Sequence, residues 1–207
     1  YQPPNWDDFS FGQWTPWWWY DWYGYNGGGQ NYQSFTGRTD ASGNHYLRLD
    51  FQGGGEPRPQ SVTAEAVVMD VNRQAWAGTT TLMVHPASIY VGMRSERYFV
   101  ERGAPLDIDL IAVDLDGNAV AGRTIKVTAE RMEWKYEQGS WNEVGVDAQE
   151  CTLSSETEPQ TCSFETSLGG KYQITAVVTD KEGRENQSRM VRWVSGGDIA
   201  PARGVEQ

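Results

Sequence analysis

The segment Pro105–Trp134 constrains the fold more than any other part of the chain, because apolar and polar residues alternate along it. Leucine and isoleucine alternate with aspartate over residues 106–110, which is the period of a strand with one face in a core and the other in water. Asp116–Asn118 supplies turn residues, and a second alternating run follows at 125–130. Two strands joined by a turn cannot bury a face alone, so the segment predicts a β-sandwich.

Alternation continues through the rest of the chain, and apolar residues recur nowhere at helical spacing. The sequence therefore predicts an all-β protein. Two strands are expected within residues 34–51, around an Asp40–Gly43 turn, and further strands at 61–69, 76–84, 88–93, 98–100, 132–136, 141–144, 151–153, 162–164, 169–180 and 188–194.

A domain boundary is expected at His85–Pro86, because proline ends ladder pairing and biases the residue before it to extended geometry. Residues 1–86 are expected to form a first β-sandwich that is incomplete and carries the Trp/Tyr-rich segment 1–33. A second sandwich is expected at 87–197, followed by a linker at 198–207.

Composition limits the classes of partner. A net charge of −11 and an isoelectric point near 4.6 argue against nucleic acid, whose phosphates require clustered Lys and Arg. No stretch approaches the roughly 20 apolar residues of a membrane helix, and no signal peptide is present. Because the sequence opens on Tyr1–Pro4, we expect a fragment of a larger protein, with any targeting signal or membrane anchor outside it.

Cys151 and Cys162 are the only cysteines, and they flank a polar segment that contains proline. A pair this close in an all-β chain is expected to form one disulfide, which would indicate an oxidising compartment. Two buried free thiols are the alternative. A metal site is not expected, because His45 and His85 lie far away in the sequence.

The first 33 residues are unusually rich in aromatic side chains. They could form a surface that stacks on sugar rings or on a protein partner, pack on a neighbouring sheet, or remain partly disordered. The residues of the possible interaction surface are Trp14, Trp17, Trp18, Trp19 and Trp22.

No catalytic constellation is recognisable, and no cofactor or metal is expected. Asp107 and Asp109 share the solvent face of one strand, where carboxylates are ordinary. The run Asp114–Asn118 resembles the opening of a calcium loop but lacks its later ligands, so a β-turn is favoured. Neither His45 nor His85 has a nucleophile or carboxylate near it in the sequence. Asn186–Ser188 is a glycosylation sequon if the source secretes through a eukaryotic pathway.

Several short segments, taken in order, resemble the tandem macroglobulin domains of bacterial alpha-2-macroglobulins. The resemblance covers residues 1–197, and its motifs are Phe35–Gly43, Val84–Gly92, Asp114–Gly122, Gly170–Tyr172 and Arg192–Gly196. It implies tandem antiparallel sandwiches of the fibronectin-III type in a large periplasmic or cell-envelope protein.

Members of that family trap proteases after cleavage of a bait region, and some couple to the attacker through a thioester. The Cys-x-Glu-Gln thioester motif is absent here, since Cys151 precedes Thr-Leu-Ser and Cys162 precedes Ser-Phe-Glu. The resemblance implies a non-catalytic scaffold whose partners are the neighbouring domains of a parent chain and the proteases trapped by that parent. The alternative is an adhesin or carbohydrate-binding sandwich that uses the Trp-rich segment.

Overall fold

The computed structural model describes residues 1–13, 32–48, 57–137 and 139–196. These residues contain eleven strands and no helix, so the predicted all-β class is confirmed. Among them, no helix has the length and apolar character needed to cross a membrane. They fall into two compact units: residues 32–48 belong to one, and all the other described residues belong to the second.

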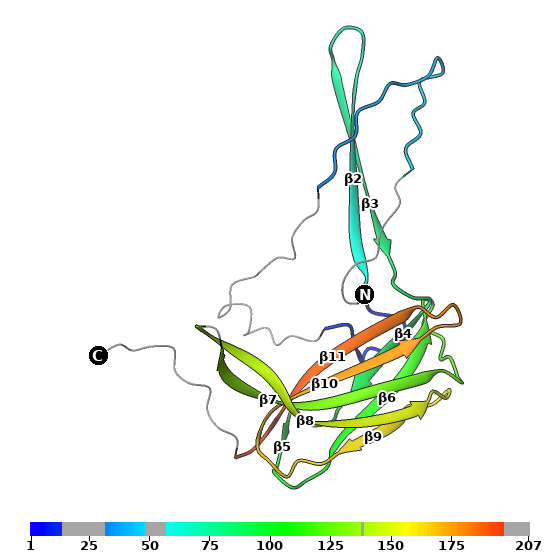
Figure 1. The fold of residues 1–207 in the computed structure, drawn as a ribbon. Helices are drawn as coiled ribbons and strands as arrows, with labels where there is room; N and C mark the ends of the chain where they lie inside the picture. The colour runs from blue at the N-terminus through cyan, green and yellow to red at the C-terminus, as the bar shows by residue number, and fades with distance from the viewer. Residues whose placement is uncertain (14–31, 49–56, 138, 197–207) are drawn as a thin grey trace. The chain divides into compact units, whose positions relative to one another are not determined.

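The larger unit contains two sheets that face each other and a separate two-stranded sheet (Figure 1). The four-stranded sheet has the order β1 (Ser10–Phe11), β4 (Ile89–Arg94), β6 (Leu106–Asp114), β9 (Gln160–Phe164). The five-stranded sheet has the order β5 (Phe99–Val100), β11 (Glu185–Val194), β10 (Gly170–Thr179), β7 (Thr124–Glu137), β8 (Ser140–Ser154). The third sheet is a hairpin of β2 (Gln60–Met69) and β3 (Ala75–Val84). All of these pairs are antiparallel except β5 with β11.

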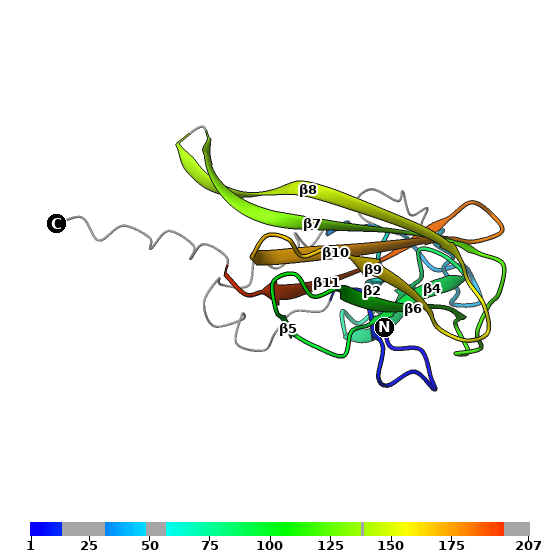
Figure 2. The same ribbon diagram turned by 90° about the horizontal axis from the view of Figure 1, so that it is seen from below.

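The main core lies between the four-stranded and five-stranded sheets, and the alternation in the sequence produces it. Leu106, Ile108 and Leu110 of β6 are buried there with Ile125 of β7 and Ile174 of β10. The aspartates between the β6 residues point away from the core, as the period of a strand requires. The predicted sandwich is therefore present in residues 89–194 (Figure 2).

A second, smaller core covers the outer face of the four-stranded sheet, and residues 1–13 supply two of its five buried residues. Phe9 and Phe11 are buried against Tyr90, Ile111 and Val113. Residues 1–13, which are expected in the first domain, thus pack on strands of the second. The division at residue 86 stays a prediction.

Gly92 shows how closely this N-terminal segment lies on the sheet. A Cβ at Gly92 would lie 2.6 Å from Cζ of Phe11, so only glycine lets the ring reach the strand. Trp6 Nε1 also donates a hydrogen bond to the Gly117 carbonyl at 2.9 Å. The segment is fixed by packing and by directional bonds together.

The two strands that the sequence joins through the turn at 114–118 lie in different sheets. The turn at 114–118 is present, but β6 pairs with β4 and β9, whereas β7 pairs with β8 and β10. After the turn, Val120 N–H donates to the Ala112 carbonyl at 2.8 Å, and the chain then crosses to the opposite sheet. Alternation reports which face of a strand is buried, and it carries no information on which strand lies beside it.

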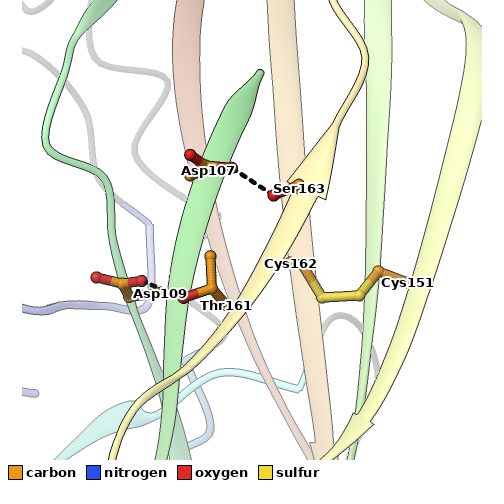
Figure 3. Close-up of a disulfide and its surroundings, with 6 residues drawn as sticks. All are labelled: Asp107, Asp109, Cys151, Thr161, Cys162 and Ser163. Atoms are coloured by element: carbon orange, nitrogen blue, oxygen red, sulfur yellow. Dashed lines mark hydrogen bonds between the residues drawn. A yellow bond between two sulfur atoms is a disulfide. The ribbon is translucent and has the colours of Figure 1, made fainter.

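The predicted disulfide between Cys151 and Cys162 is confirmed, and it joins the two sheets (Figure 3). Cys151 lies on the edge strand β8 and Cys162 on the edge strand β9, with their Cα atoms 6.1 Å apart. The two strands are neighbours but belong to different sheets. Near the other edge, hydrogen bonds link Val91 of β4 to Asn186 and Ser188 of β11. The sandwich is therefore fastened along both sides.

One turn geometry occurs four times in the described residues, and two of these turns, around Asp40 and Asp114, match turns predicted from the sequence. In each, an aspartate Oδ1 accepts hydrogen bonds from the backbone N–H groups two and four residues later; these aspartates are Asp40, Asp70, Asp114 and Asp180. Around the first of them, the described residues 32–48 form the turn but no strand. Residues 49–51 of the strand expected there lie outside the described residues.

Candidate interaction surface

The β2–β3 hairpin is the most exposed regular element in the described part of the chain. Every residue of both strands is exposed except Val62, which is half-buried. Trp76, Leu82 and Val68 are 73%, 60% and 53% exposed, values that are unusual for large apolar side chains in a paired strand. An isolated two-stranded hairpin is at best marginally stable in water. The hairpin is therefore the part of the described surface with most to gain from a partner.

The register of the hairpin divides its side chains between two faces. Val62 pairs with Leu82, Ala66 with Gly78, and Val68 with Trp76. Because directly paired residues project to the same side, these pairs share one face. We call this the apolar face; its residues are Gln60, Val62, Ala64, Ala66, Val68, Trp76, Gly78, Thr80, Leu82 and Val84.

The opposite face contains the only charged side chain of the two strands, Glu65. It also carries a cross-strand hydrogen bond of 3.1 Å between the hydroxyls of Thr63 and Thr81. The two faces thus differ in chemistry although both are exposed. The opposite face also carries the exposed Val67, Met69 and Met83, whereas the apolar face holds Trp76 and Leu82 and no charged residue.

Hydrogen bonds occur at the tip of the hairpin and in the segment that follows β3. At its tip, Asp70 closes the repeated aspartate turn, with Arg73 at φ 65°. After β3, His85 Nδ1 lies 2.6 Å from the Tyr90 hydroxyl. Burial raises the pKa of Tyr90 to about 12, with a smaller contribution from Tyr1. The connection from β3 to β4 thus contacts β4 through His85.

The carboxylates Asp107 and Asp109 point outward from β6, as the sequence predicts, and they bond to neighbouring strands. Ser163 donates a hydrogen bond to Asp107, and Thr161 donates one to Asp109 at 2.7 Å (Figure 3). Arg94 of β4 forms an ion pair with Asp109 at 2.8 Å. These carboxylates hold β4, β6 and β9 in register, which is a structural use.

The Asp114–Asn118 run forms the favoured β-turn. Burial raises the pKa of the Asp114 carboxyl, but hydrogen bonds from Asn118 and from backbone N–H groups outweigh it, so the pKa lies below its ordinary value. The carboxylate oxygens are thus used by the turn itself. No group of three His, Cys, Asp or Glu residues that could hold a metal ion occurs in the described residues.

The remaining polar candidates also have structural roles or lie apart. His85 contacts the Tyr90 hydroxyl, as described above. The imidazole of His45 stands against Gly37, where a Cβ would come within 2.4 Å of its Cε1. Asn186 is 1% exposed, and its Oδ1 accepts a hydrogen bond from Val91 N–H at 3.2 Å. Burial inside the sandwich argues against glycosylation at Asn186.

The tryptophans proposed as an interaction surface, Trp14, Trp17, Trp18, Trp19 and Trp22, lie outside the described residues. Sequence reasoning missed a different aromatic pair, Tyr136 and Trp141, which face each other across β7 and β8. Their ring centroids are 5.5 Å apart, and they are 61% and 52% exposed. The signal that could have revealed the pair is an aromatic residue on each side of a predicted hairpin turn.

Sequence reasoning also predicted β2 and β3 as strands without recognising their exposure. The signal available was charge: only one of the twenty strand residues is charged, in a chain with 45 charged side chains (17 Lys and Arg plus 28 Asp and Glu). Strands buried in a core commonly lack charged residues, so the low charge of β2 and β3 does not by itself indicate exposure. Alternation alone does not tell whether anything covers it.

Comparison with known proteins gives similarity only to solved structures: no protein-family model matches the sequence, and no curated protein matches it. Alpha-2-macroglobulin of Salmonella, reacted with methylamine, is 17% identical with a TM-score of 0.40; the match covers 65% of this chain and 10% of that one. Alpha-2-macroglobulin of Escherichia coli in its native conformation is 15% identical with a TM-score of 0.38, over 69% of this chain and 11% of that one.

A CARDB domain from Pyrococcus furiosus is also similar, at 15% identity and a TM-score of 0.31, over 52% of this chain and 94% of that domain. The present chain spans about a tenth of the length of the macroglobulins it matches. None of these values places the chain in a family.

Proposed function

We propose that this chain is a non-catalytic structural part of a macroglobulin-like, protease-trapping protein of the cell envelope. The observation that carries the proposal is the ordered series of sequence segments that resembles bacterial alpha-2-macroglobulins. Three of these segments lie at connections or ends of strands. Val84–Gly92 connects β3 to β4, Asp114–Gly122 connects the two sheets, and Arg192–Gly196 ends the last strand.

In this role the chain would supply rigidity and spacing rather than chemistry. The sandwich is suited to it, because its carboxylates tie strands together and its two edges are fastened by a disulfide and by β4–β11 hydrogen bonds. Its partners would be the neighbouring domains of the parent chain and the proteases trapped by that parent.

The test is made on the full-length parent protein. Its intact mass is measured before and after methylamine, and its native-gel mobility before and after a broad-specificity protease. A methylamine adduct with a mobility shift, or a mobility shift alone, would support a trap that works with or without a thioester. If methylamine leaves the mass unchanged and protease treatment leaves the mobility unchanged, the protease-trapping proposal fails.

A further inference from the structure

Around its centre, the apolar face of the β2–β3 hairpin has a pattern of side-chain sizes that is complementary to itself. Along the face, the large pair Val62–Leu82 lies on one side of the central Ala64–Thr80 pair, and the small pair Ala66–Gly78 lies on the other. A Cβ added at Gly78 would meet nothing within 4 Å. The face therefore has a ridge and a hollow at equal distances from its centre.

Such a surface matches a copy of itself turned by half a rotation. A two-fold axis that crosses the strands at the Ala64–Thr80 pair sets the Val62–Leu82 ridge of each copy over the Ala66–Gly78 hollow of the other. The same operation sets the Val68–Trp76 pair of each copy over the Gln60–Val84 pair of the other, so side chains along the whole hairpin face the second copy. Interfaces with two-fold symmetry use the same patch on both partners in this way.

Charge also favours a second copy as the occupant. The chain carries a net charge of −11, but the apolar face carries none, and Glu65 lies on the opposite face. Two copies can therefore approach through this face with less repulsion than through an acidic surface. A basic partner would find no carboxylate on the face to pair with.

We propose that the apolar face of the β2–β3 hairpin is a self-association surface, on which two copies of this chain pack face to face with Leu82 in the Ala66–Gly78 hollow. This inference does not rest on the proposed function. Ten residue pairs at about 3.3 Å per residue and two strands about 4.8 Å apart give a face of roughly 330 Å² per copy. A stable interface usually needs about 800 Å² per partner, so the dimer is weak and depends on concentration.

The test is sedimentation velocity of the chain from about 5 to about 500 µM, a range that spans weak association. Wild-type protein is expected to convert from monomer to dimer and to stop at two copies, because a two-fold interface closes on itself. The deciding variant is Gly78→Val, which fills the hollow while making the face more apolar and the strand more favourable. Packing of Leu82 into the hollow predicts at least a tenfold weaker dimer for Gly78→Val.

Ala77→Val is the matched control, because it enlarges the adjacent residue of the same strand on the opposite face. Its dimer constant is expected to stay within about twofold of wild type. A wild-type chain that remains monomeric would overturn the proposal, as would growth beyond the dimer. A Gly78→Val variant that associates as tightly as wild type, or more tightly, would also overturn it, since that result indicates general stickiness rather than a fitted interface.

Discussion

Asp180 closes its own turn and also binds a residue of a distant segment, Ser88. Its Oδ1 accepts the backbone bonds of the turn after β10, and its Oδ2 accepts hydrogen bonds from the backbone N–H and hydroxyl of Ser88 and from Arg184 Nε. Burial raises the pKa of the Asp180 carboxyl, but the hydrogen bonds from Ser88 and Arg184 outweigh it and place the pKa well below its ordinary range. Asp180 thus ties the β10–β11 turn to the start of β4.

We predict that Asp180→Asn lowers the free energy of unfolding at pH 7 by about 2 kcal/mol, because hydrogen bonds to a buried charge are lost. Asp70→Asn, in an exposed turn of the same geometry, is expected to cost less than about 1 kcal/mol. A carboxyl with a lowered folded pKa stabilises above its unfolded pKa of about 4 and loses this effect as pH falls toward the folded value. Urea unfolding at pH 7 and near pH 3 checks this. Equal loss of stability in wild type and Asp180→Asn on acidification would contradict it.

Arg73 is the one described aspartate-turn residue that adopts a left-handed backbone without being glycine, with φ at 65°. The equivalent positions in the other three turns are glycines with φ between 78° and 84°. We predict that Arg73→Gly stabilises the hairpin by up to about 1 kcal/mol, because the strain on the Cβ is removed. Hydrogen exchange of the β2 and β3 amides measures the change. Faster exchange in the variant would show that the arginine side chain contributes more than its backbone costs.

At the scale of elements, the strands could be predicted from the sequence but their partners could not. Alternation placed β2, β3 and β10 close to their observed bounds, because burial of one face is a local property, whereas β7 and β8 each unite two of the expected strands. The sheet to which each strand belongs is decided by long-range contacts. For this reason the turn that joins β6 to β7 does not reveal that the two strands lie in opposite sheets. The disulfide could be predicted from spacing, although its role in joining two sheets could not.

We predict that replacing Cys151 and Cys162 by alanine lowers the free energy of unfolding by about 2.8 kcal/mol, the chain-entropy value for the observed separation of 11 residues. A reducing agent should lower the stability of wild type by a similar amount and leave the variant unchanged. Thermal unfolding with and without dithiothreitol measures both effects. If reduction has no effect on wild type, the link between β8 and β9 does not limit unfolding.

Across the larger unit, stability is expected to be uneven. The sandwich has two buried cores and is fastened on both sides, whereas β2 and β3 pair only with each other among the described strands. The candidate surface could not be predicted from the sequence because strands with an uncovered face and strands in a core have the same alternation. Only the tertiary structure shows that Trp76 and Leu82 are exposed.

This difference in stability predicts that the hairpin and the sandwich unfold locally in two separate processes. Amides of β2 and β3 are expected to exchange about a thousandfold or more faster than those of β6 and β10, because the hairpin can open without disturbing either core. Exchange followed by mass spectrometry at about 1 µM, where weak association is negligible, measures the difference. A core variant, Ile174→Ala, should accelerate exchange in β6 and β10 and leave the hairpin unchanged, since each segment then reports its own opening. If all four strands instead exchange at one rate, the hairpin opens only with the whole sandwich.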